Sequence, residues 1–81
     1  MAIRLVSVSK NSVRTDVSFQ VLGNPGELVD CQGVLLGQGQ MNFSPVATTA
    51  QIAAAILARA AELYAEGYEA WTLRNELAPL L

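Results

Sequence analysis

Hydrophobic and polar residues alternate with a period of two in the first part of the chain. In "VRTDVSFQVL" (13–22) one face carries Val13, Thr15, Val17, Phe19 and Val21, and the other carries Arg14, Asp16, Ser18 and Gln20. This alternation is typical of an antiparallel strand with one buried face. The β-branched segment "IRLVSVS" comes before it, and "KNS" between the two can turn the chain. We therefore predict strands near 2–9 and 13–22, paired as a hairpin.

A third strand is predicted near 28–36, after the turn signal "GNPG" (23–26). In "ELVDCQGVLL" one face of this strand would carry Val29, Cys31 and Leu35, and the other Asp30 and Gln32, with a bulge at Gly33. The next segment, "GQGQMNFSP" (37–45), is interpreted as a loop or an irregular edge strand. Its glycines, Gly37 and Gly39, lack the full spacing and the lysine of a phosphate-binding loop.

The second half of the chain is predicted to be helical from about residue 49. The sequence "TTAQ" (48–51) fits a capping box, in which Thr48 and Gln51 bond to each other's backbone. Gly67 either ends this helix or is tolerated inside a longer one, and Pro79 stops it. The fold class is therefore α+β, in a single domain of residues 1–81. An N-terminal antiparallel β-meander of three to four strands (1–43) is packed by a C-terminal long or Gly-broken helix (44–81).

The predicted helix is apolar over more of its circumference than one sheet can cover. At 100° per residue, a first strip contains Ile52, Ile56, Leu63 and Ala70. A second strip, about 110° further round, contains Leu57, Tyr64, Tyr68 and Trp71, and alanines extend its edge. The charged side contains Arg59, Glu62, Glu66, Glu69 and Glu76. The first strip is expected to cover Val17, Phe19 and Val21 in the core.

The second strip is the candidate contact for another helix. That helix is either the chain's own segment 68–77, folded back at Gly67, or part of a neighbouring subunit. The first choice would make the aromatic residues core, and the second would make them an interface. The predicted protein interface consists of Leu57, Tyr64, Tyr68, Trp71, Leu80 and Leu81.

Composition favours a partner chain as the stabiliser of this small domain. The chain has 81 residues, of which 52 % are hydrophobic and 15 % charged, with one cysteine and no histidine. One cysteine excludes an intramolecular disulfide, and the lack of histidine removes the commonest metal ligand. We expect no cofactor and no metal site. Such small chains usually need a disulfide, a metal or a partner chain, so a homo-oligomer or docking onto other structural proteins is expected.

Nucleic-acid, membrane and catalytic functions are not expected. The net charge is −2 and no basic stripe is present, although nucleic-acid binders normally have one. The longest apolar run, 52–58, is much shorter than the roughly 18 residues of a membrane span. Glu62 and Glu66 fit a solvated, salt-bridged helix face better than a catalytic pair. Cys31 is interpreted as a small core residue. We predict no catalytic residues and no enzymatic activity.

In general style the chain resembles the small, uncharacterised virion proteins of tailed bacteriophages. These often join a short strand region such as "RTDVSFQVLGNPGELVDCQGVLL" to a helix entered through a segment like "ATTAQIAAAI". The resemblance implies a structural protein present in many copies, such as a capsid decoration, neck or tail accessory, located in the virion. The alternative is a small cytoplasmic regulatory or adaptor module that binds one protein partner through the aromatic strip.

Overall fold

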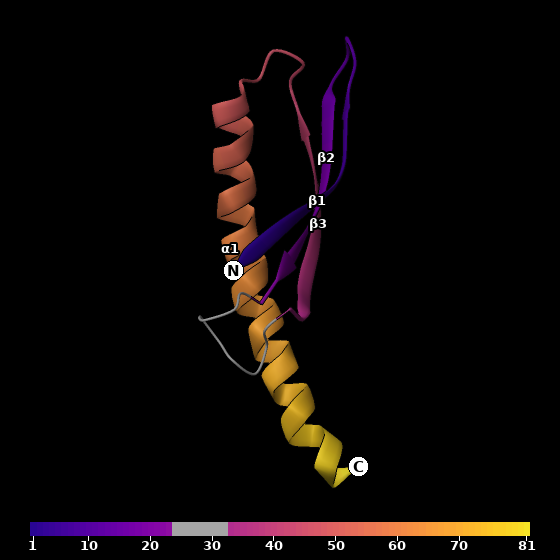
Figure 1. Ribbon diagram of the computed structural model, residues 1–81, viewed down its shortest axis with the longest axis vertical. Helices are drawn as coiled ribbons and strands as arrows, with labels where there is room; N and C mark the ends of the chain where they lie inside the picture. Colours follow the sequence, from indigo (N-terminus) through magenta and orange to yellow (C-terminus); the bar gives the residue numbers. More distant parts are fainter. Residues whose placement is uncertain (24–32) are drawn as a thin grey trace.

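A three-stranded antiparallel sheet and one long helix form the structure, a computed structural model that describes residues 1–23 and 33–81. The strand order is β1-β2-β3, so each strand pairs with its neighbour in sequence (Figure 1). This confirms the predicted α+β fold, with a meander of three strands. The elements are β1 (Ala2–Lys10), β2 (Thr15–Leu22), β3 (Leu35–Phe43), α1 (Thr49–Leu77) and the short 3₁₀ helix η2 (Ala78–Leu80).

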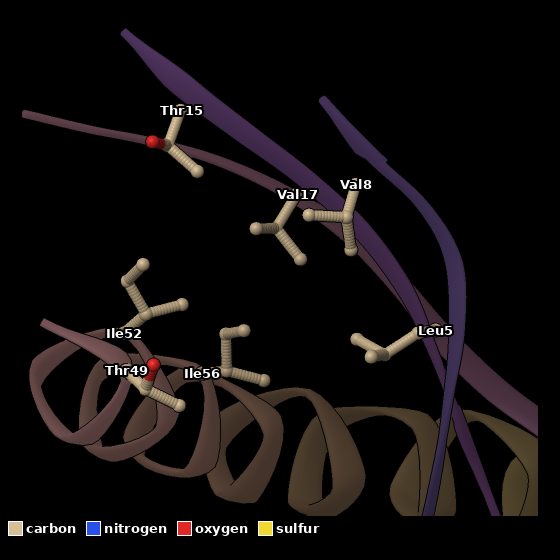
Figure 2. A pocket seen from close by; sticks show the side chains of 7 residues that line it. All are labelled: Leu5, Val8, Thr15, Val17, Thr49, Ile52 and Ile56. Carbon is tan, nitrogen blue, oxygen red and sulfur yellow. The ribbon is translucent and has the colours of Figure 1, made fainter. Parts of the chain in front are cut away.

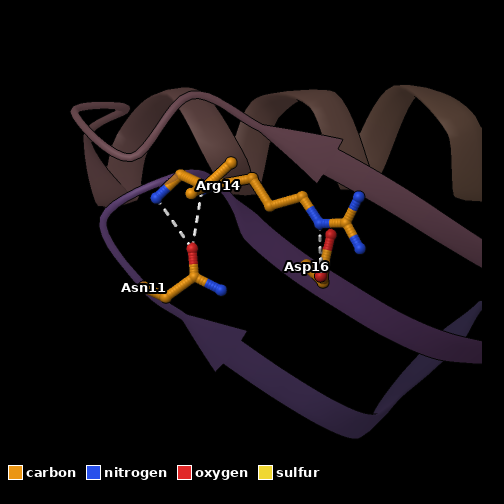
Figure 3. A network of polar contacts seen from close by, with 4 residues as sticks. Asn11, Arg14 and Asp16 are labelled. Atoms are coloured by element: carbon orange, nitrogen blue, oxygen red, sulfur yellow. Dashed lines mark hydrogen bonds and ion pairs between the residues drawn. The ribbon is translucent and has the colours of Figure 1, made fainter.

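An asparagine-centred turn closes the β1–β2 hairpin. Asn11 Oδ1 accepts hydrogen bonds from the backbone N–H groups of Val13 (2.8 Å) and Arg14 (3.0 Å). The network of Asn11, Arg14 and Asp16 is drawn in Figure 3, where the Arg14 guanidinium also pairs with Asp16 at 3.0 Å. Val13 is 77 % exposed within this turn. Its predicted place on the buried face of the strand is therefore wrong, because the strand begins only at Thr15.

The sheet has one apolar face and one polar face, as the alternation in 13–22 predicts. The residues Thr15, Val17, Phe19 and Val21 are buried. On the opposite face, Arg4 donates to Oε1 of Gln20, its partner in the β1–β2 register. One hydrophobic core thus lies on a single side of the sheet, where α1 packs.

The third strand lies further along the chain than predicted. It runs from Leu35 to Phe43, so the segment interpreted as a loop is mostly strand, while 28–32 fall outside the described residues. The register places Gly37 opposite Val21, Gly39 opposite Phe19 and Met41 opposite Val17. Leu36 is buried against α1 at the start of the strand, but the next inward positions are Gly37 and Gly39, which show no hydrophobic side chain. This is why the pattern did not reveal it.

Helix α1 begins at the predicted capping box. The Thr48 hydroxyl accepts from the Gln51 N–H (3.2 Å), and the Gln51 side chain accepts from the Thr48 N–H (2.9 Å). The helix then continues without a break to Leu77, so Gly67 neither ends nor divides it. The predicted core is confirmed: Ile56 and Ala60 are buried with Val17, Phe19 and Val21, and Ile52 and Leu63 pack against them.

Replacing the capping residue should measurably weaken the fold. We expect Thr48→Ala to lower the free energy of unfolding by about 1 kcal/mol, because the Gln51 backbone N–H loses the hydroxyl that accepts its hydrogen bond. The neighbouring Thr49→Ala removes a hydroxyl of the same kind from the first helical residue and should cost much less. Urea denaturation followed by circular dichroism compares the two. Equal losses would show that the capping box does not stabilise α1.

Glycine allows α1 and β3 to approach closely. A Cβ atom added to Gly67 would lie 1.9 Å from the carbonyl oxygen of Leu36, and one added to Gly37 would lie 3.1 Å from Cβ of Leu63. Gly67 is therefore a packing position inside a continuous helix, which is one of the two roles that the sequence left open for it. Because of this contact α1 packs mainly on β3 and less on β2.

The molecule is elongated along α1. Its radius of gyration is 15.1 Å, whereas a compact domain of this length has about 11.7 Å. The longest extent is 52 Å, against 26 and 17 Å in the other directions. Figure 1 shows the reason: the last turns of α1 continue past the end of the sheet.

Candidate interaction surface

The last turns of α1 form an overhang that none of the strands β1, β2 and β3 covers (Figure 1). Trp71 still lies beside Val34 and Leu35 at the start of β3. Past it, four leucines face solvent, and we name them the leucine stripe: Leu73 (54 % exposed), Leu77 (43 %), Leu80 (79 %) and Leu81 (100 %). Together with Ala70 and Ala78, three of them line a shallow groove. Leucines at such spacing share one side of a helix, so the overhang has one exposed apolar side among the residues that the structure describes.

A second uncovered apolar region lies between β1 and the first turns of α1. We name it the β1–α1 groove; it measures about 210 Å³ and is shown in Figure 2. Leu5 and Val8 point into it from β1, and Ile52 and Ile56 from α1. Leu5 is 58 % and Val8 60 % exposed, although their strand partners, Phe19 and Val17, are buried. Ile3 at the start of β1 packs against the core. Further along the strand the inward side remains open, because α1 packs mainly on β3 and less on β2.

The structure separates the residues of the predicted aromatic strip. Tyr64 packs against the core cluster. Tyr68 and Trp71 are half-buried and stacked, with ring centroids 6.0 Å apart and an interplanar angle of 29°. Leu57 is 54 % exposed. Tyr64 and Trp71 thus contact the chain's own sheet side, while Leu57, Leu80 and Leu81 remain accessible.

Sequence reasoning did not single out Leu73, Leu77 or the β1–α1 groove. The two leucines carried a signal, since positions 73, 77, 80 and 81 follow helical spacing. The sequence contained no signal for the β1–α1 groove, because the groove depends on which strands of the sheet the helix packs against.

The charged residues of α1 lie at the surface, as predicted. Arg59 and Glu62 form an ion pair of 2.8 Å, with side-chain exposures of 45 % and 65 %. Glu66 and Glu69 are also exposed. A surface pair of this type contributes little to stability. It leaves the guanidinium within reach of solvent or of another chain.

Among residues 1–23 and 33–81 there is no group of three potential metal ligands. None of the helices in these ranges combines the length and the hydropathy that crossing a bilayer requires. Comparison of the chain with protein-family models, curated proteins and solved structures gives no match.

Proposed function

We propose that the chain is a non-enzymatic structural subunit of a multi-copy assembly, and that α1 provides the contact. The leucine stripe supports this proposal most directly. Fully burying one leucine side chain contributes about 1.5–3 kcal/mol relative to leaving it in water. Four neighbouring leucines on an uncovered helix therefore favour coverage by another protein surface. The resemblance in sequence style makes the virion of a tailed bacteriophage the assembly that we propose.

The surface area of the whole chain supports the same conclusion. The chain exposes 5427 Å² and has a mass of 8.6 kDa. A folded monomer of this mass exposes about 4,700 Å². The excess, roughly 700 Å², is close to the roughly 800 Å² that each partner buries in a standard interface. An excess of this size would suit a subunit with one standard interface, and the partners that we propose are further copies or other structural proteins.

A pair of matched leucine variants tests the proposal. Leu57 and Leu73 are both 54 % exposed, but only Leu73 belongs to the overhang. We expect Leu73→Asp to weaken association at least about thirtyfold, the effect of losing an interface anchor of about 2 kcal/mol. Leu57→Asp should change association little. Sedimentation equilibrium measures the association, and circular dichroism checks that both variants stay folded.

The other outcomes contradict part or all of the proposal. If Leu57→Asp weakens association and Leu73→Asp does not, the contact is the aromatic strip rather than the overhang. If the unmutated chain is monomeric at every concentration and binds one single protein, it is an adaptor and not an assembly subunit.

A further inference from the structure

We infer that the occupant of the uncovered face of α1 is a second copy of this chain, related by a two-fold axis that makes the two α1 helices antiparallel. This inference rests on the proposed function and names the partner and its orientation. Three observations lead to it: the positions of the two uncovered regions, the charges between them, and the excess surface described above.

The two uncovered regions lie on the same side of α1, at its opposite ends. Residues seven apart on a helix lie nearly above one another, because two turns contain about 7.2 residues. One such line within α1 consists of Ile52, Arg59, Glu66 and Leu73. Its first residue lines the β1–α1 groove, and its last belongs to the leucine stripe. A single neighbouring helix lying along this line would reach both regions.

The residues on this line complement each other when the second helix is antiparallel. A two-fold axis between residues 62 and 63 brings Ile52 of one copy level with Leu73 of the other. The same axis brings Arg59 level with Glu66. The apolar side chain of Ile52 then faces the apolar Leu73, and the positive Arg59 faces the negative Glu66. Each contact occurs twice, as the symmetry of a two-fold interface requires.

A parallel pair would have the opposite effect on the charges. It would place Arg59 beside Arg59 and Glu66 beside Glu66, and like charges facing each other across an interface are unfavourable. It would also leave the β1–α1 groove without the leucines of the other copy. The charge pattern along α1 therefore favours the antiparallel arrangement.

The groove and the leucine stripe also fit each other. With Leu73 of the second copy level with Ile52, its side chain lies at the groove mouth formed by Leu5 and Val8. These two residues are more than half exposed in the single chain. The pairing therefore covers the open side of β1 and the overhang in one interface. An excess of about 700 Å² per copy is sufficient, since a standard interface buries about 800 Å² per partner.

Disulfide trapping tests the orientation. The background is Cys31→Ser, which removes the only cysteine. We expect Ile52→Cys/Leu73→Cys to form covalent dimers when oxidised glutathione is added, and each single substitution to form none. In one helix, positions 52 and 73 are about 31 Å apart, so the double variant cannot form the bond within one chain. The single variants are the matched controls.

The outcomes separate this inference from the proposed function. Covalent dimers from the single variants would indicate parallel helices and overturn the inference. A double variant that stays dimeric by native mass but forms no disulfide would also overturn the inference. Both results leave assembly intact. A native mass of one chain at every concentration would also overturn the inference, and it would contradict the proposed function only if the chain then binds one single protein.

A charge exchange gives a second measurement that needs no cysteine. We expect Glu66→Arg to weaken the dimer at least about tenfold, because Arg59 of the other copy then faces a like charge. Adding Arg59→Glu to that variant should restore the association, since the opposite signs meet again. If the double variant associates no better than Glu66→Arg, the two residues do not face each other and the antiparallel register is wrong.

Discussion

Phe19→Ala is expected to lower the free energy of unfolding by about 3–5 kcal/mol. The Phe19 ring is 1 % exposed and lies in the middle of the core, between Val17 and Val21 on β2. On the β3 side it lies over Gly39, where an added Cβ would be only 2.5 Å from the ring atom Cζ. Glycine has no side chain to move into the space left by the ring. We therefore expect a cavity to remain, and cavities of this type are costly.

Urea denaturation measures this effect, and Phe43→Ala is the matched control. Phe43 is a half-buried phenylalanine at the end of β3, so its removal opens the surface and leaves a smaller cavity. A typical domain has only about 5–15 kcal/mol of stability in total, so the Phe19 variant should be close to unfolding. Equal losses in the two variants would show that the core is not centred on Phe19.

Gly67→Ala is expected to destabilise the protein by about 1–2 kcal/mol, although alanine is the better helix former. Alanine is favoured over glycine inside a helix by about 1 kcal/mol. The new Cβ would collide with the Leu36 carbonyl oxygen, 1.9 Å away, which is backbone and cannot rotate aside. Helix α1 would have to move away from β3, and overpacking of this type costs about 1–3 kcal/mol or more. The free-energy cost of the collision is expected to exceed the gain in helix propensity.

Thermal and urea unfolding of Gly67→Ala test this balance. Ala65→Gly, at an exposed position of the same helix, measures the propensity term alone and should cost about 1 kcal/mol. If Gly67→Ala is more stable than the unmutated protein, α1 and β3 do not approach as closely as described.

The parts of the fold that could be predicted are those in which side chains show the periodicity. Val17, Phe19 and Val21 alternate with polar residues, so the strand and its buried face follow directly from the pattern. The helix was predictable from its capping residues, Thr48 and Gln51. The third strand was not, because Gly37 and Gly39 occupy inward positions where a hydrophobic residue is normally expected. Whether Gly67 bends the helix could not be decided without knowing that Leu36 lies against it.

The candidate interaction surface was predictable only in part. Leu80 and Leu81 were assigned to it from the sequence, and the structure leaves both exposed. A helical wheel finds apolar strips, but it does not tell which strip lies on the sheet. The structure places Tyr64 against the core and leaves Leu73 and Leu77 in solvent. This difference arises from the position of α1 over β3, and that position depends on tertiary packing.

The overhang gives one continuous helix two sources of stability. Up to Gly67, side chains of α1 are fixed against the sheet, whereas the turns after Trp71 depend on their own hydrogen bonds. These turns extend a helix that is already nucleated, so opening and closing them in a single copy carries no nucleation cost. In the proposed dimer, covering the leucine stripe would hold these turns closed. Ordering them would then take part of the interaction free energy and lower the affinity per unit of buried area. If the proposed dimer forms, its subunits should therefore exchange faster than the size of the contact suggests.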